Sequence, residues 1–290
     1  MKTYKLVALL ALLLFSPGCK RKSNYEKAME YYNSMRTTQA LLLLKYSNIP
    51  REVYLEGKIY LTLNDPRRAL KSFEKLIEIA PEWKEKALVD LKKAGEDANR
   101  KGKDFTAVLI YNKILEYDPD FELGMKNFLL GDWYFDSQNY DKAIEFYQAG
   151  LDYDSLNVEV RLKLAQCFIH NDDLVSSYET LKKGMETNSY WRFKYWVGKV
   201  SFQLAKKRYK EGNYNSAELY LGEVISASLP KVLVDDAYFL LGDIRLSQEK
   251  YQEAKSCYRE VLKINRFAEP KIAREAKDRL RIIENMEKKS

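Results

Sequence analysis

The chain has 290 residues, enough for one or two ordinary domains with a sizeable core. It holds only 12 Gly and 7 Pro, while Leu, Lys, Glu, Ala and Tyr are abundant, and this composition favours helices over sheets. The 49 Lys and Arg residues exceed the 42 Asp and Glu residues by seven and are interspersed with them. So mild a charge balance does not indicate a nucleic-acid-binding protein.

The first 18 residues have the pattern of an export signal. Two lysines precede an apolar run over residues 6–15, which is shorter than the roughly 20 residues needed to span a bilayer. The junction before Cys19 resembles the lipobox of bacterial lipoproteins. That resemblance implies a signal peptide over 1–18, acylation of Cys19, and a location in the bacterial cell envelope, on the outer membrane facing the periplasm. An ordinary cleaved signal followed by an incidental cysteine is the alternative interpretation.

The segment after the leader is predicted to be helical. Residues 19–49 form an anchor or linker and an N-terminal helix, and 24–48 could be half of a degenerate repeat. From residue 50 onward a trio of residues recurs six times: a small residue, another small residue twelve positions later, and a large apolar or aromatic residue four positions after that. Its members are Gly57, Ala69 and Phe73; Gly95, Ala107 and Tyr111; Gly131, Ala143 and Tyr147; Ala165, Ser177 and Leu181; Ala205, Ala217 and Leu221; and Gly242, Ala254 and Tyr258.

This spacing predicts pairs of antiparallel helices that approach closely where the side chains are small, with the third residue filling the space beside the contact. A single helix pair cannot bury its apolar face, so the copies must stack. The pattern resembles the tetratricopeptide repeat, a unit of about 34 residues. The resemblance implies an all-α fold, a right-handed superhelical solenoid of about six helix pairs with flanking helices.

The repeat array is predicted to cover residues 50–268. Its approximate repeats are 50–83, 88–121, 124–157, 158–191, 198–231 and 235–268. Residues 269–290 carry an amphipathic stripe and are predicted to form a C-terminal capping helix.

No catalytic or metal-binding constellation is visible. His170 is the only histidine, which excludes histidine-based triads and multi-histidine metal sites. Cys167 and Cys257 each lie in an amphipathic helical pattern and are interpreted as small buried apolar residues. We therefore expect a protein that is not an enzyme and needs no cofactor or metal.

The resemblance also implies that the first helix of each pair lines a concave groove. Counted from the start of each repeat, positions 5 and 12 are apolar or aromatic in five of the six repeats. These candidate groove residues are Tyr54, Leu61, Phe128, Phe135, Leu162, Ile169, Phe202, Tyr209, Phe239 and Leu246. Position 9 carries mixed charge, with Lys58, Glu96, Asp132, Gln166, Lys206 and Asp243. The other interpretation places the apolar residues in the core.

An apolar groove edged by mixed charge suits an extended peptide or an amphipathic helix. We therefore expect a lipid-anchored interaction scaffold that binds other envelope proteins and no nucleic acid. It is similar in architecture to the repeat lipoproteins of outer-membrane β-barrel assembly and of pilus assembly. The alternative is an accessory subunit of an envelope polysaccharide- or peptidoglycan-processing enzyme complex.

Overall fold

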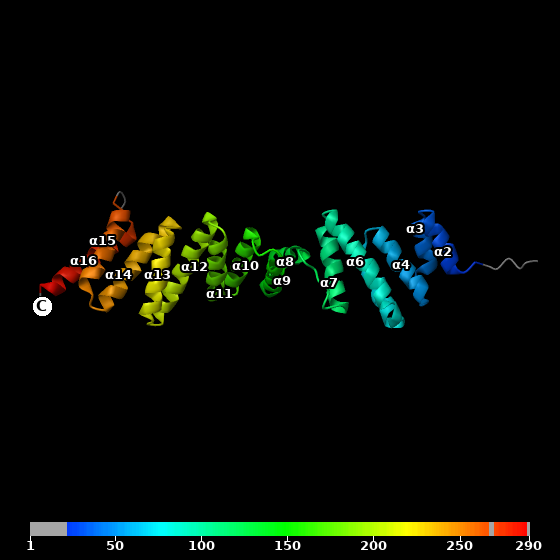
Figure 1. Ribbon diagram of the computed structural model, residues 1–290, viewed down its shortest axis with the longest axis horizontal. Helices are drawn as coiled ribbons and strands as arrows, with labels where there is room; N and C mark the ends of the chain where they lie inside the picture. The colour runs from blue at the N-terminus through cyan, green and yellow to red at the C-terminus, as the bar shows by residue number, and fades with distance from the viewer. Residues whose placement is uncertain (1–21, 267–269, 289–290) are drawn as a thin grey trace, which may run out of the picture. The chain divides into compact units, whose positions relative to one another are not determined.

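A computed structural model describes residues 22–266 and 270–288, and over these residues the chain is helical with no β-strand. The leader 1–18 and Cys19 lie outside the described residues, so the export signal and the lipid attachment stay predictions. No helix within the described ranges is long and apolar enough to cross a membrane. The all-α architecture of successive packed helix pairs is confirmed (Figure 1).

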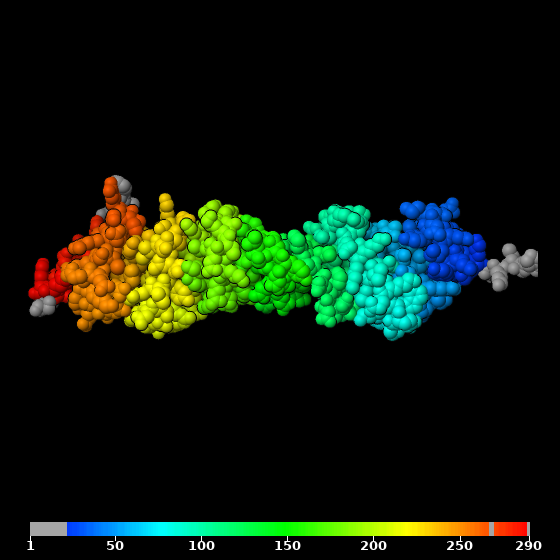
Figure 2. Space-filling model, in the orientation of Figure 1, coloured from blue at the N-terminus to red at the C-terminus, as the bar shows by residue number. Residues whose placement is uncertain are grey.

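The chain divides into two compact units, Met1–Glu122 and Leu123–Ser290, each with its own helix pairs. The described helices of the first unit are α2 (Asn24–Asn33), α3 (Thr37–Leu44), α4 (Pro50–Thr62), α5 (Pro66–Ile79), the 3-10 helix η1 (Pro81–Trp83), α6 (Lys84–Arg100) and α7 (Asp104–Tyr117). Those of the second are α8 (Lys126–Asp136), α9 (Tyr140–Tyr153), α10 (Val158–His170), α11 (Leu174–Thr187), α12 (Trp191–Lys210), α13 (Tyr214–Ala227), the 3-10 helix η2 (Lys231–Leu233), α14 (Val234–Ser247), α15 (Tyr251–Ile264) and α16 (Lys271–Glu287). Within each unit neighbouring helix pairs are in contact, and their atoms form a continuous surface on the face shown in Figure 2.

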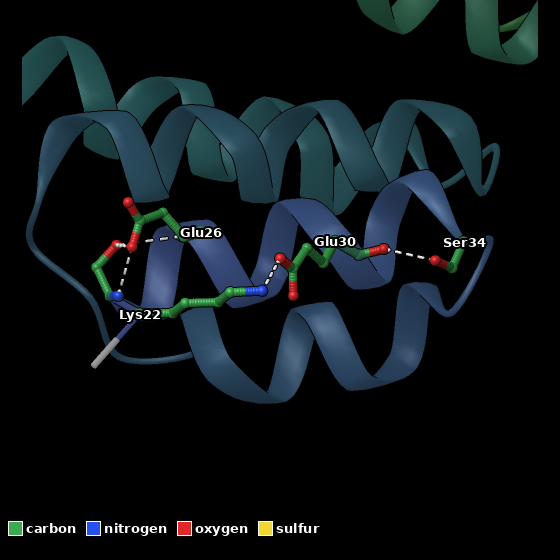
Figure 3. A network of polar contacts seen from close by, with 5 residues as sticks. Lys22, Glu26, Glu30 and Ser34 are labelled. Atoms are coloured by element: carbon green, nitrogen blue, oxygen red, sulfur yellow. Dashed lines mark hydrogen bonds and ion pairs between the residues drawn. The ribbon is translucent and has the colours of Figure 1, made fainter. Parts of the chain in front are cut away.

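A capping box fixes the start of α2. The Ser23 backbone N–H donates to Glu26 Oε2 at 2.7 Å, and the Glu26 N–H donates back to Ser23 Oγ at 3.2 Å. Lys22 pairs with Glu30 along the helix, and Ser34 Oγ donates to the Glu30 carbonyl at 2.8 Å where α2 ends (Figure 3). The chain then reverses through Met35, whose φ is 59°. The segment predicted as one N-terminal helix is therefore a complete pair, α2 and α3.

Tight turns inside the pairs place one residue in the left-handed region. Glycine takes this conformation without steric cost at Gly102 and Gly212, with φ of 65° and 74°. An Asp or Asn then begins several of the second helices by capping. For α9, Asn139 Oδ1 accepts from the Lys142 N–H at 3.3 Å, and for α11, Asp173 Oδ1 accepts from the Ser176 N–H at 3.0 Å. These turns return the second helix of the pair against the first.

The insertion over residues 190–197, between the fourth and fifth repeats, lengthens a helix. It forms the first turns of α12, which begins at Trp191 and runs for 20 residues. Gly198, the first residue of the fifth predicted repeat, lies against the backbone of Leu229, and a Cβ there would overlap that carbonyl. A larger residue at 198 would therefore separate α12 from the segment that follows α13.

At the end of the chain, α16 packs against α15. Ala276 and Ile283 are fully buried in a cluster with Tyr258 and Val261, while Ile272 and Leu280 pack on its edge. The apolar stripe of α16 thus covers the face that the sixth repeat would otherwise leave open.

Candidate protein-binding surface

The small residues of the repeated trio lie in the interior of the helix pairs. Every alanine of the trio is at most 1% exposed: Ala69, Ala107, Ala143, Ala165, Ala205, Ala217 and Ala254. The four glycines are also buried, and each lies against the ring of the third residue. A Cβ would stand 3.0 Å from Phe73 at Gly57, 2.9 Å from Tyr111 at Gly95, 2.5 Å from Tyr147 at Gly131, and 2.7 Å from Tyr258 at Gly242. A partner protein cannot reach these residues, so the binding surface lies elsewhere.

In the second unit, two acids at position 9 hold the helix pairs together. Tyr147 Oη donates to Asp132 Oδ1 at 2.6 Å, and Lys163 Nζ from the following helix α10 donates to the same oxygen at 2.7 Å. Burial, followed by the hydrogen bond to Asp132, raises the pKa of Tyr147 far above its ordinary value. These groups link α8, α9 and α10.

The same arrangement recurs at the end of the chain. Tyr258 Oη donates to Asp243 Oδ1 at 2.7 Å, and Arg279 Nε from α16 donates to that oxygen at 3.0 Å. The acids predicted to edge the groove therefore form structural hydrogen bonds. Sequence reasoning missed this link. Its signal is an Asp at position 9 together with a tyrosine as the third trio residue and a basic residue on the next helix, a combination found in the third and sixth repeats.

None of the ten candidate groove residues is exposed. Nine are partly buried, and Leu162 is 1% exposed, inside a cluster with Leu181 and Phe193. Phe128 lies directly against Gly150, and the ring centroid of Phe135 is 5.9 Å from that of Tyr140. The others, Tyr54, Leu61, Ile169, Phe202, Tyr209, Phe239 and Leu246, are likewise half-buried. Their remaining surface can still contact a partner, except at Leu162, which contributes to the core.

In the first unit, Tyr54 belongs to an aromatic and charged cluster. Its ring centroid is 5.3 Å from that of Trp83, and Lys86 Nζ lies 4.4 Å from the Tyr54 centroid and 4.6 Å from the Trp83 centroid. Tyr54 Oη donates to Asp90 Oδ2 at 2.5 Å, and burial, followed by this bond, raises the pKa of Tyr54. Sequence reasoning did not single out Trp83, the last residue of the first predicted repeat, or Lys86, which falls between the first and second predicted repeats.

In the second unit, a cleft of about 430 Å³ lies between the end of α10 and the last turns of α12. Ile169 and Leu174 supply apolar surface, and Lys206, Lys207 and Lys210 line the cleft from α12. All three lysines are exposed, and in the described part of the chain none of them forms an ion pair. The cleft therefore combines an apolar wall with a basic edge, on which three lysines outnumber one acid.

This cleft includes two of the residues singled out from the sequence, Ile169 and Lys206. It adds Lys207 and Lys210, whose signal is the basic run KKRYK at 206–210. Asp172 is its one acidic lining residue. The surrounding field consequently favours a negatively charged ligand.

The described residues contain no group of three or more His, Cys, Asp or Glu side chains that could hold a metal ion. Cys167 and Cys257 are free thiols. Burial raises the pKa of both, for Cys167 to about 12, so neither is an activated nucleophile. His170, the last residue of α10, is exposed and stacks on Tyr140 with the ring centroids 4.3 Å apart.

Family models of the tetratricopeptide repeat match residues 53–82, 134–189 and 235–267. Together with the helix pairs, these matches identify the chain as a tetratricopeptide repeat protein and hence as a scaffold for protein interactions. Proteins of this repeat class bind peptides or protein partners. A search of curated proteins found no match.

Several solved structures are similar to the chain. One is the C-terminal part of a repeat-containing protein from Cytophaga hutchinsonii, 16% identical over 87% of this chain and 98% of that one, with a TM-score of 0.42. Another is a repeat protein from Bacteroides fragilis, 14% identical over 69% and 98%, with a TM-score of 0.45. A third is the type IV pilus biogenesis factor PilW, 16% identical over 70% and 91%, with a TM-score of 0.30. TM-scores below 0.5 do not establish a shared superhelical geometry.

Proposed function

We propose that the protein is a non-catalytic scaffold that binds a segment of a partner protein in the cleft between α10 and α12. The observation that carries this proposal is the pairing of an apolar wall, Ile169 and Leu174, with three exposed lysines. A peptide fits such a site when it presents one apolar side chain to the wall and acidic side chains to the lysines.

The charge of the cleft defines the partner segment further. Lys206, Lys207 and Lys210 occupy consecutive turns of one helix, so acids spaced along an extended strand or one face of a helix can meet them. Because the lysines are exposed, their contribution is to association rate and specificity, and salt should weaken binding. We propose an acidic amphipathic segment as the partner.

A cross-linking experiment tests the cleft directly. A photoreactive amino acid replaces Gln203, which lines the cleft, and in a matched control it replaces Leu219, which is 74% exposed on α13 and does not line the cleft. We expect cross-links from position 203 to map to one segment of a partner, which carries acidic side chains and an apolar side chain. Position 219 should give no cross-links to that segment. Cross-linked peptides that do not differ between the two positions would contradict the proposed site.

A charge-neutralised variant supplies the second measurement. This variant combines Lys206→Gln, Lys207→Gln and Lys210→Gln. We expect its affinity for the captured segment to be at least tenfold lower than that of the wild-type protein. The matched control neutralises three other exposed lysines outside the cleft, Lys93, Lys142 and Lys194. If both triple variants lose affinity equally, the effect is one of net charge and the cleft is not the site.

We further propose that the scaffold is lipid-anchored through Cys19 in the bacterial cell envelope and serves outer-membrane protein or pilus assembly. The apolar run of the leader and the cysteine that follows it support this location. Metabolic labelling with an alkyne-tagged fatty acid tests the anchor. We expect label on the wild-type protein and none on Cys19→Ala, and an unlabelled wild-type protein would refute it.

A further inference from the structure

The side chain of Arg161, in the first turn of α10, is buried without a counter-ion. The residue is 5% exposed, and its guanidinium makes one hydrogen bond, from Nη2 to the Ser155 carbonyl at 2.6 Å. Over the described residues, no carboxylate lies within ion-pair distance of it. Arginine carries five N–H donors, so most of its hydrogen-bonding capacity remains unused.

The fold does not require a charge at this place. The equivalent fourth position of the first two repeats is filled by Val53 and Leu91, which are 1% and 0% exposed. An apolar side chain therefore satisfies the packing, whereas a desolvated cation without a partner costs free energy. Burial accordingly lowers the pKa of the Arg161 guanidinium. A ligand that pairs with the charge would offset this cost.

Space for such a ligand adjoins Arg161. Arg161 lines a cleft of about 410 Å³ formed by α9, α10 and α11. The stem of Arg161 lies against Gly184 of α11, where a Cβ would stand 2.9 Å from Arg161 Cδ. This cleft shares no lining residue with the one between α10 and α12.

The other lining groups define what the cleft can hold. Gln148, Thr180 and Lys183 offer hydrogen-bond donors, and Leu151 and Leu164 offer apolar surface. Asp152 and Glu179 also line the cleft and are exposed, so they oppose a doubly charged phosphate more than a singly charged carboxylate. A carboxylate also matches the planar donor fork of a guanidinium.

We propose that this cleft binds a carboxylate group, with Arg161 as its counter-ion. The carboxylate belongs either to a small organic acid or to a peptide chain, and both sources present the same chemistry to Arg161. The inference concerns a site separate from the partner-binding cleft and stands independently of it.

The experiment follows the Nε–Hε resonance of Arg161 by NMR in the full chain while carboxylates are added. The probes are acetate and propionate, with inorganic phosphate and the neutral analogue propionamide for comparison. We expect saturable shifts with the carboxylates, at least tenfold weaker binding of phosphate, and no effect of propionamide. A peptide with a free C-terminus, compared with its amidated form, shows whether a chain terminus is accepted better than the free acids.

Variants assign the binding to Arg161. We expect Arg161→Met to lose at least tenfold in carboxylate affinity measured by calorimetry, and Arg161→Lys to lose less because it keeps the charge without the fork. Lys183→Met, at another lining position, should keep most of the affinity. The proposal is overturned if the Arg161 resonance does not saturate with any carboxylate, if phosphate binds as well as propionate, or if folded Arg161→Met binds normally. If Arg161→Met does not fold, the affinity of Arg161→Lys and the shift of the wild-type Arg161 resonance still test the proposal.

Discussion

The pair α4 and α5 in the first unit and the pair α8 and α9 in the second share one packing contact and differ in another. In both, a glycine of the first helix lies against an aromatic ring of the second, Gly57 against Phe73 and Gly131 against Tyr147. Only the second pair adds a hydroxyl, which donates to Asp132. Close packing inside a helix pair therefore requires a small residue facing a ring. The hydrogen bond from the hydroxyl to the acid is a separate feature, which connects one pair to the next.

The residue at position 9 explains the difference. In the first pair it is Lys58, whose Nζ lies 5.6 Å from the Tyr54 ring centroid and 3.9 Å from Asp90. In the second it is Asp132, which accepts from both Tyr147 and Lys163 of the next helix pair. The first pair thus contacts the next helix α6 through Lys58 and Asp90, and the second contacts α10 through a buried tyrosine and its acid.

The largest effect is expected at the shared contact. In Gly131→Ala the new Cβ would stand 2.5 Å from the Tyr147 ring, so the helices must separate or the ring must shift. We expect a loss of roughly 1 to 3 kcal/mol in the free energy of unfolding, the usual cost of overpacking an interior. Urea denaturation measures this loss, and amide hydrogen exchange should locate it in α8 and α9.

The first unit provides the matched substitution. In Gly57→Ala the Cβ would stand 3.0 Å from Phe73, a smaller overlap, and we expect a smaller loss. If Gly57→Ala were the more destabilising of the two, the tighter contact would not lie in the second unit and the comparison would fail.

A smaller effect is expected from removal of the hydroxyl. In Tyr147→Phe the ring stays and Asp132 keeps Lys163, so only one buried hydrogen bond is lost. We expect a loss of about 1 kcal/mol, and a similar loss in Tyr258→Phe, which breaks the bond to Asp243.

The reverse substitution in the first unit is the control for the hydroxyl. Phe73→Tyr introduces a hydroxyl in a repeat whose position 9 is Lys58 and not an acid, so no gain in stability is expected. If the same urea titration showed Phe73→Tyr to be more stable than the wild-type protein, the hydroxyl would stabilise the pair through the surroundings of the ring and not through a hydrogen bond to an acid such as Asp132.

The same tyrosines should make the folded protein less stable at alkaline pH. Burial, then hydrogen bonding to the aspartates, raises the pKa of Tyr147 and Tyr258 above the ordinary value of 10. As the pH rises above 10 the unfolded chain loses these protons first, so it binds fewer protons than the folded chain and stability falls. We expect urea midpoints to fall as the pH rises above about 10, and to fall less steeply in Tyr147→Phe. Identical slopes would contradict the assignment.

The helix pairs could be predicted from the sequence because the trio reflects a packing requirement within each pair. Two small residues and one large residue at fixed spacing specify a close helix pair without reference to the rest of the chain. The break between α2 and α3 could not be predicted, because it depends on Met35 in the left-handed region, a conformation for which methionine gives no signal. The start of α12 at Trp191 was equally hidden, since 190–197 has no counterpart in the other repeats.

The candidate surfaces were only partly predictable. Ile169 and Lys206 were singled out by their repeat positions, but the cleft they share with Lys210 depends on how the end of α10 faces α12. Arg161 gave a signal, a charge at the position where the first two repeats have Val53 and Leu91. This signal becomes informative only when the side chain is seen to be buried. Burial and pairing are properties of the packed structure, and the sequence pattern alone does not contain them.

The smallest effect should have the opposite sign. Gly222 lies in α13, is exposed, and has no neighbouring atom within 4 Å of where a Cβ would stand, unlike Gly131. Gly222→Ala should therefore stabilise the second unit by about 0.5 to 1 kcal/mol, because alanine loses less backbone entropy on entering a helix. Urea denaturation of this variant alongside Gly131→Ala separates helix propensity from packing, since both add one methyl group to a helical glycine. A loss of stability at Gly222 would mean that α13 makes a contact on its exposed face, and that the cost at Gly131 could not be attributed to the Tyr147 ring alone.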